Sequence, residues 1–288
     1  MDYVQIDKTV RDSLQRNVVC RLLMGSHAHG IADEHSDVDY IYIYVDCEYD
    51  KTFHCESVGY QYKLDGVDEN YQELRMFIRN VINGKNPSDF ESLHGDFEFC
   101  GKLLDSDSRM FFNDIMKVLR SVRSYSLIKS YTGFAKKDAK HAKEMLETGC
   151  RYDARALRKK LSHLYRGNII ANDLLMDNKY QFGHSALMWT CKDKARKIKC
   201  AEYLTEIDQI ERFIEEQEFL TQFIRDKAAV MLSSHELSRR ASIESQMKIE
   251  SRLKDFLISS DNHFIPVSYG HIRHQIWEYG PDFQYRKK

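Results

Sequence analysis

One segment near the N-terminus constrains the fold of this chain more than any other part of the sequence. An apolar run, Val18 to Met24, stops at Gly25-Ser26. After ten intervening residues, a second run rich in Ile, Val and Tyr opens with Asp37-x-Asp39. Short apolar runs bounded by turn residues predict buried strands. Because side chains alternate along a strand, the two aspartates are expected on the same face.

This pattern of residues predicts a particular chemistry. Two aligned carboxylates repel each other unless a cation lies between them. Oxygen ligands at a strand edge suit Mg²⁺, which also keeps waters and substrate phosphates as ligands. Gly25 permits close approach of the backbone, and the Ser26 hydroxyl and N–H can bind phosphate oxygens. Together these groups are suited to metal-assisted nucleotidyl transfer.

The extended pattern resembles a known signature. Gly25-Ser26 followed by Asp37-x-Asp39 is similar to the signature of the DNA polymerase β-like nucleotidyltransferase superfamily. The longer form, Gly-Ser-x-Ala-x-Gly followed by Ser-Asp-x-Asp-Tyr, resembles one branch, the predicted nucleotidyltransferases associated with RNA repair in bacteria and phages. The likeness covers roughly residues 17 to 175 and includes further stretches in the expected order: Glu73-Leu74-Arg75, Asn83 to Pro87, Glu91-Ser92-Leu93, Tyr131 to Lys137, and Lys159-x-x-x-His163-x-x-Arg166.

The resemblance implies a site for two Mg²⁺ ions. Asp37 and Asp39 would bind both ions, and a third carboxylate on the neighbouring strand would complete the ligand set. Asp68 matches the position of this third carboxylate because it lies five residues before Glu73. Asp65 is the alternative, since it ends the same strand-like run.

A second set of candidates lies in the C-terminal half. Lys159, His163 and Arg166 stand at i, i+4 and i+7, so a helix presents them on one face. They are expected to grip a triphosphate or an RNA backbone opposite the carboxylates, the alternative being a solvated helix face. We expect Arg166→Ala to weaken substrate binding or turnover by about 1.5–3 kcal/mol. We also expect it to leave thermal stability nearly unchanged.

The expected architecture is α+β. A small mixed-sheet, polymerase β-like nucleotidyltransferase domain at 1–104 would be followed by an all-helical domain at 105–288. Apolar periodicity predicts the elements in this order: a short helix at 4–15, strands at 18–24, 38–45 and 57–64 with a helical turn at 26–32, a helix at 69–83, a possible short strand within 88–99, and helices at 110–119, 127–146, 152–175, 201–232 and 242–258.

Composition limits the possible environment and partners. The chain has 288 residues, 42% of them hydrophobic and 30% charged, with a formal net charge of −1. That charge argues against a strongly basic nucleic-acid coat but leaves room for a local basic face. No apolar stretch approaches the length of a membrane span. Seven cysteines without a Cys-x-x-C pair indicate free thiols in a reducing cytoplasm.

The sequence therefore predicts a cytoplasmic, Mg²⁺-dependent nucleotidyltransferase. It would move a nucleoside monophosphate from an NTP to a hydroxyl and release pyrophosphate. The resemblance points to an RNA end, such as that of a damaged tRNA, as the acceptor. Two alternatives stay open: an enzyme that adenylylates proteins, and a catalytically idle, antitoxin-like binding module.

Overall fold

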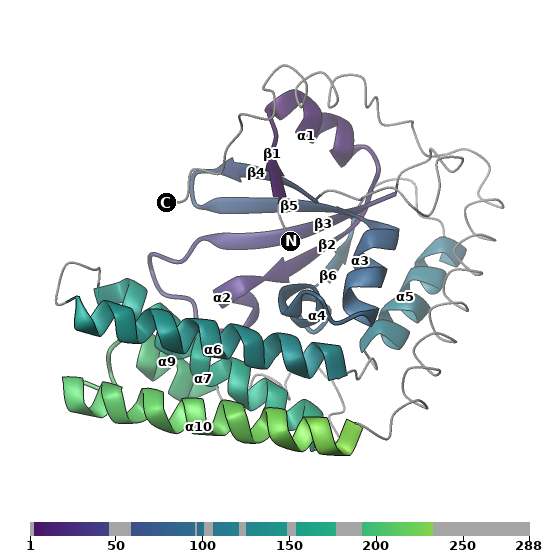
Figure 1. Ribbon diagram of the computed structural model, residues 1–288. Helices are drawn as coiled ribbons and strands as arrows, with labels where there is room; N and C mark the ends of the chain where they lie inside the picture. Colours follow the sequence, from purple (N-terminus) through teal and green to yellow (C-terminus); the bar gives the residue numbers. More distant parts are fainter. Residues whose placement is uncertain are drawn as a thin grey trace, which may run out of the picture.

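The protein combines a six-stranded mixed sheet with a bundle of helices, the α+β architecture that the sequence predicts (Figure 1). The computed structural model describes residues 3–45, 59–95, 97–100, 106–120, 125–148, 154–176 and 192–232. The strands are β1 (Tyr3–Gln5), β2 (Val18–Met24), β3 (Val38–Tyr44), β4 (Gly59–Leu64), β5 (Val67–Glu73) and β6 (Phe97–Phe99). The helices are α1 (Lys8–Gln15), α2 (Gly25–Ala28), α3 (Leu74–Ile82), α4 (Pro87–Ser92), α5 (Ser106–Arg120), α6 (Tyr125–Glu147), α7 (Ala154–Leu175), α9 (Lys192–Lys199) and α10 (Ile207–Leu232).

The sheet brings aspartates of two separate strands together. Its strand order is β1-β4-β5-β3-β2-β6. The central strands β3 and β5 run parallel, with Asp39 directly beside Asp68, whereas β2 and β3 run antiparallel. Because β2 ends at Met24, opposite Asp39, the glycine-serine turn lies next to the two carboxylates.

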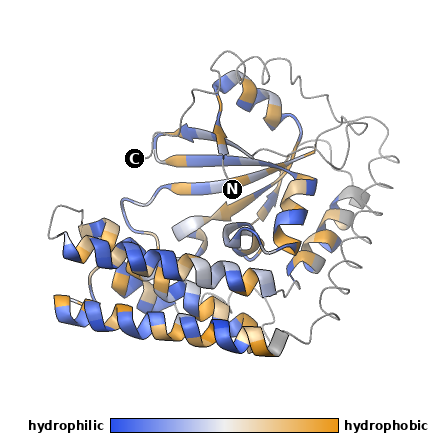
Figure 2. Ribbon diagram, in the orientation of Figure 1, coloured by the Kyte–Doolittle hydropathy of each residue, from blue (hydrophilic) through white to orange (hydrophobic). Residues whose placement is uncertain are grey.

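Alternation along β3 divides its side chains between two cores. Ile41 and Ile43 face α3 and α4 in the largest core, while Tyr42 and Tyr44 pack under α1 in a smaller one. The tyrosine face is thus covered as well: Tyr44 is 2% exposed. Figure 2 shows that the helices carry hydrophobic and hydrophilic residues along their length, as helices with one buried face do.

The helix predicted at 69–83 is wrong in its first part. Residues 67–73 form β5, and α3 begins only at Leu74. Apolar periodicity could not reveal β5 because its buried side chains are largely polar and are satisfied by distant partners. Glu69 accepts two hydrogen bonds from Arg11, at 2.5 and 2.7 Å. Glu73 caps α3 by accepting hydrogen bonds from the backbone N–H groups of the next turn.

Smaller differences also have local causes. The segment 4–15 is divided into β1 and α1, because Asp7 accepts a hydrogen bond from Val10 N–H and caps α1. The helix expected from 201 begins at Ile207, after Ala201 and Leu204 adopt positive φ. The short strand expected within 88–99 is β6, whereas the helices α4 and α9 were not predicted. The helix expected at 242–258 lies outside the described residues.

The main core contains residues from both sides of the expected domain boundary at 104. It joins residues of β2 and β3 to residues of α5, α6, α7 and α10. A second core lies inside the helical bundle. Its buried members lie between Ala135 and Ile214, apart from Ile31 of the N-terminal part. None of the helices described here has the length and apolar character that crossing a membrane requires.

Candidate active site

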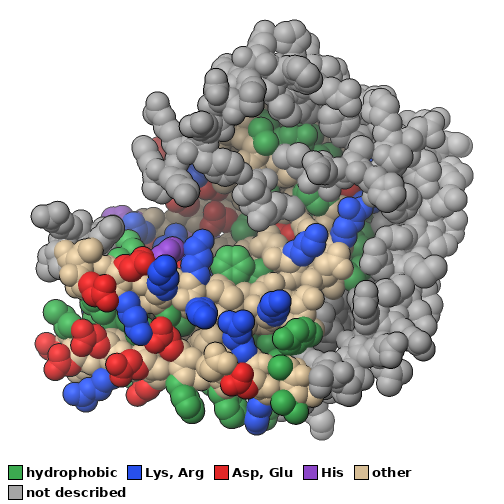
Figure 3. All heavy atoms as spheres, in the orientation of Figure 1, with side chains coloured by type: hydrophobic (Ala, Val, Ile, Leu, Met, Phe, Trp, Pro, Cys, Tyr) green, Lys and Arg blue, Asp and Glu red, His purple; other side chains and the backbone are tan. Residues whose placement is uncertain are grey.

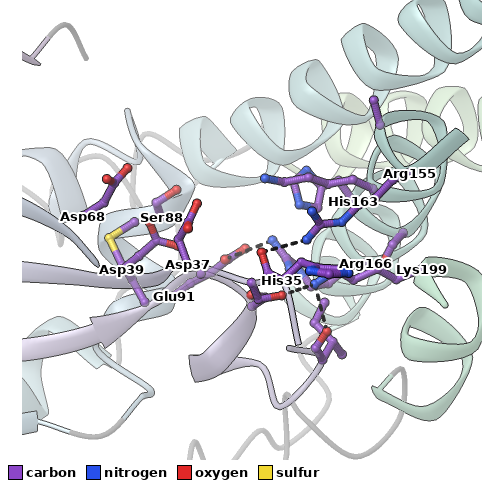
Figure 4. Close-up of a pocket in the computed structure, with 18 of the residues that line it drawn as sticks. His35, Asp37, Asp39, Asp68, Ser88, Glu91, Arg155, His163, Arg166 and Lys199 are labelled. Atoms are coloured by element: carbon purple, nitrogen blue, oxygen red, sulfur yellow. Dashed lines mark hydrogen bonds and ion pairs between the residues drawn. The ribbon is translucent and has the colours of Figure 1, made fainter. Parts of the chain in front are cut away.

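A cavity of about 560 Å³ lies between the sheet and the bundle. Figure 4 shows acidic side chains on the sheet side and basic side chains on the helical side. Ser88 and Glu91 of α4 also line the cavity. The structure brings all eight predicted site residues to this one cavity: Gly25, Ser26, Asp37, Asp39, Asp68, Lys159, His163 and Arg166.

The acidic wall is formed at neighbouring strands. Asp37 immediately precedes β3, Asp39 lies in β3, and Asp68 is its neighbour in β5. Burial and the charge of Asp68, with a further contribution from Asp37, raise the pKa of the Asp39 carboxyl. Asp65 lies in the exposed turn between β4 and β5 and does not line the cavity. Of the two candidates for the third carboxylate, Asp68 is therefore the one beside Asp39.

The glycine of the signature has a direct steric reason. Gly25 has φ +67°, a conformation that other residues rarely adopt. A Cβ placed on Gly25 would collide with Oδ2 of Asp39. The carboxylate therefore occupies the space that the missing side chain leaves. This close approach places the Ser26 turn against the acidic wall.

The donor set fits a hard cation. Asp37 and Asp39 offer only oxygen ligands, and Mg²⁺ is often held by one or two carboxylates together with substrate phosphates. Asp68 pairs instead with Lys63, whose Nζ lies 2.9 Å from Asp68 Oδ2. Consistent with that pairing, no three His, Cys, Asp or Glu side chains of the described residues are grouped to hold a metal ion. To join Asp37 and Asp39 as a metal ligand, Asp68 would have to exchange Lys63 for the cation.

Arg166 has a different environment from the one expected. Its side chain is only 14% exposed, and its Nη2 lies 3.5 Å from Oε2 of the buried Glu91. His29 Nε2 lies 2.7 Å from the same oxygen. Although burial opposes ionisation, Arg166 and His29 lower the pKa of Glu91 to about 2. Arg166 therefore compensates a largely buried charge, so we now expect its removal to cost stability, unlike the expectation from the sequence.

The other two basic candidates differ in charge. Burial, together with the cations of Arg166 and Lys159, lowers the pKa of His163 well below its usual value. His163 is therefore neutral at neutral pH and can act as a hydrogen-bonding group rather than a cation. Lys159 lines the cavity, and its charge partly opposes the rise in the pKa of Asp39. Within the described part of the chain, no hydrogen bond or ion pair engages the Lys159 ammonium.

Sequence reasoning missed several residues of the helical side. Arg155 of α7 and Lys199 of α9 line the cavity and contact the loop before β3. Glu91 lies in a stretch that the resemblance includes, but its burial was not evident from the sequence. Polar residues that pair across long separations leave no periodic signal.

Comparisons with known proteins place few limits on this chain. No protein-family model matches the sequence, and no curated protein matches it. Among solved structures, a nucleotidyltransferase-like protein from Exiguobacterium sibiricum 255-15 is similar over 87% of this chain and 88% of its own. The identity is 15% and the TM-score is 0.35. This similarity is too low for the neighbour's name to be carried over, so the site has to support the function.

Proposed function

We propose that this protein is a Mg²⁺-dependent nucleotidyltransferase that moves a nucleoside monophosphate from an NTP to a hydroxyl acceptor. One observation carries the proposal: a single cavity holds aligned aspartates, a glycine-serine turn and a basic wall, formed by side chains of the helices such as Lys159, Arg166 and Lys199. The resemblance of these same residues to the polymerase β-like superfamily agrees with it. A catalytically idle module is disfavoured, because burial and the neighbouring aspartates raise the pKa of Asp39, and these aspartates contribute nothing to the core.

The reaction forms one bond and breaks one. The acceptor oxygen attacks the α-phosphorus, the bond from that phosphorus to the β-phosphate oxygen breaks, and pyrophosphate leaves. Asp37, Asp39 and Asp68 would hold two Mg²⁺ ions, which when bound would neutralise phosphate charge and acidify the acceptor hydroxyl. Ser26 and Lys159 would orient the triphosphate, and a carboxylate of the acidic wall would accept the hydroxyl proton.

An RNA end is the proposed acceptor. The helix α6 presents four exposed lysines, Lys129, Lys136, Lys137 and Lys140, over roughly 16 Å of its length. The only acid among residues 125–143, Asp138, is buried and pairs with Lys160 at 2.8 Å. Figure 3 shows Lys and Arg side chains gathered along α6, beside the hollow that holds acidic side chains. A local basic surface of this kind suits a phosphate backbone despite the net charge of −1.

The proposal is tested by following the label of each α-labelled NTP. The purified protein is incubated with Mg²⁺ and either total RNA or a protein mixture. We expect label in RNA, and a loss on the order of 10³-fold in Asp39→Asn. Asp65→Asn is the matched control, because Asp65 is an exposed acid nearby that does not line the cavity. Label in protein would make the enzyme a protein adenylyltransferase. Equal labelling by Asp39→Asn would contradict the proposal.

A further inference from the structure

The loop between α2 and β3 is held by the helical part of the chain at both of its ends. Ile31 is 2% exposed and lies in the core of the bundle. Its carbonyl accepts a hydrogen bond of 3.1 Å from Lys199 of α9. At the other end, Ser36 Oγ accepts a hydrogen bond of 2.8 Å from the same ammonium. The next residue along the chain is Asp37.

Asp33 is the centre of this arrangement. Its carboxylate accepts hydrogen bonds from Ser36 Oγ at 2.7 Å and from Arg155 Nη2 at 3.2 Å. Lys199 Nζ lies 3.4 Å from its second oxygen. Arg155 also donates to the carbonyl of His35 at 2.8 Å. Two cations from α7 and α9 thus hold a loop in which Ser36 already donates a hydrogen bond to Asp33.

The burial of these groups indicates a defined geometry rather than a loose surface contact. The Lys199 side chain is 7% exposed, and that of Asp33 is 22% exposed. Although burial opposes its ionisation, the hydrogen bond from Ser36 and the charge of Lys199 lower the pKa of Asp33 to about 2. Asp33 is therefore ionised throughout the physiological range, and losing it leaves the buried Lys199 side chain without its carboxylate.

We infer that the helical part sets the position of Asp37 through this loop, with Asp33 and Lys199 as positioning residues for the metal-binding aspartates. The loop connects the Ser26 turn to Asp37, so a shift of the loop would move both the Ser26 turn and Asp37. The inference rests on the proposed function, because it assumes that Asp37 and Asp39 bind a divalent cation. It differs from a role in holding nucleotide directly, which Lys199 could have because it also lines the cavity.

Binding of Mn²⁺ to the full chain, measured by calorimetry without substrate, tests the inference. We expect Asp33→Asn and Lys199→Met each to weaken Mn²⁺ binding about tenfold, as loss of a supporting partner does. The double variant should show about the same tenfold loss rather than a hundredfold loss, because both changes break the same Asp33–Lys199 ion pair. Lys199→Arg should retain most of the affinity. Lys197→Met, at an exposed lysine of the same helix, is the matched control.

The outcomes separate this inference from the proposed function. Wild-type affinity for Mn²⁺ in Asp33→Asn, together with weaker NTP binding in Lys199→Met, would make Lys199 a nucleotide ligand and overturn the inference alone. No Mn²⁺ binding by the wild-type protein would overturn both. If Lys199→Met does not fold, Asp33→Asn and the milder Ser36→Ala still test the loop, since each removes one partner without burying new charge.

Discussion

The two walls of the cavity differ in whether their charges are paired within the protein. On the sheet side, Asp37 and Asp39 lie together without an ion-pair partner among the described residues, and burial and repulsion raise the pKa of Asp39. On the helical side, most cations are neutralised by acids of the protein itself: Arg166 by Glu91, and Lys199 by Asp33. The acidic wall therefore has charge available for a ligand, whereas most of the basic wall serves the fold. Lys159 is the exception.

The largest expected effect tests whether Arg166 serves the fold. Arg166→Met should lower the free energy of unfolding by about 3 kcal/mol, because it leaves the buried Glu91 carboxylate without its main partner. Urea unfolding measures the change. Adding Glu91→Gln should restore much of the loss. Arg155→Met, on the same helix but with a side chain 47% exposed, should cost less than about 1 kcal/mol. Equal stability of Arg166→Met and the wild type would remove the contrast between the walls.

The next effect concerns Lys159, the cation of the helical side that no described residue pairs with. Lys159→Met should weaken NTP binding by about 2 kcal/mol, roughly 30-fold, since a hydrogen bond to a charged phosphate is lost. Stability should change little, because no described group forms a hydrogen bond or ion pair with the Lys159 ammonium. The neighbouring Lys160→Met should leave NTP affinity unchanged, as Lys160 pairs with Asp138 outside the cavity. Fluorescence titration with an NTP analogue distinguishes the two; equal losses would refute the assignment.

The smallest effect belongs to the acidic wall. Asp39→Asn should raise the free energy of unfolding by about 1 kcal/mol at neutral pH, because it removes carboxylate repulsion at a site kept for function. Since folding raises the pKa of Asp39, its ionisation destabilises the folded state above that pKa. The gain should therefore fade as pH falls and the wild-type carboxyl becomes protonated. Thermal unfolding of both proteins at neutral and acid pH measures it. A variant less stable than wild type at neutral pH would contradict the repulsion.

The same contrast explains what the sequence could predict. The strands β2 and β3 and the neighbouring aspartates follow from local apolar runs and alternation, which depend on residues close in the chain. The strand β5 was missed because its buried Glu69 is satisfied by Arg11, 58 residues away. Arg155 and Asp33 lie 122 residues apart, so no local pattern links them. The candidate ligands of the acidic wall were therefore predictable, and the partners that neutralise the basic wall were not.

The shared core has a consequence for how the chain loses its structure. Ile41 and Ile43 of the sheet belong to the same apolar cluster as Ile170 of α7 and Ile224 of α10. Opening the bundle would expose the underside of the sheet to water, so neither part can lose its packing while the other keeps it. Amide protons of β3 and of α7 should thus exchange with solvent through one cooperative opening with a common free energy. Two fragments divided near residue 104 would each lack half of that core.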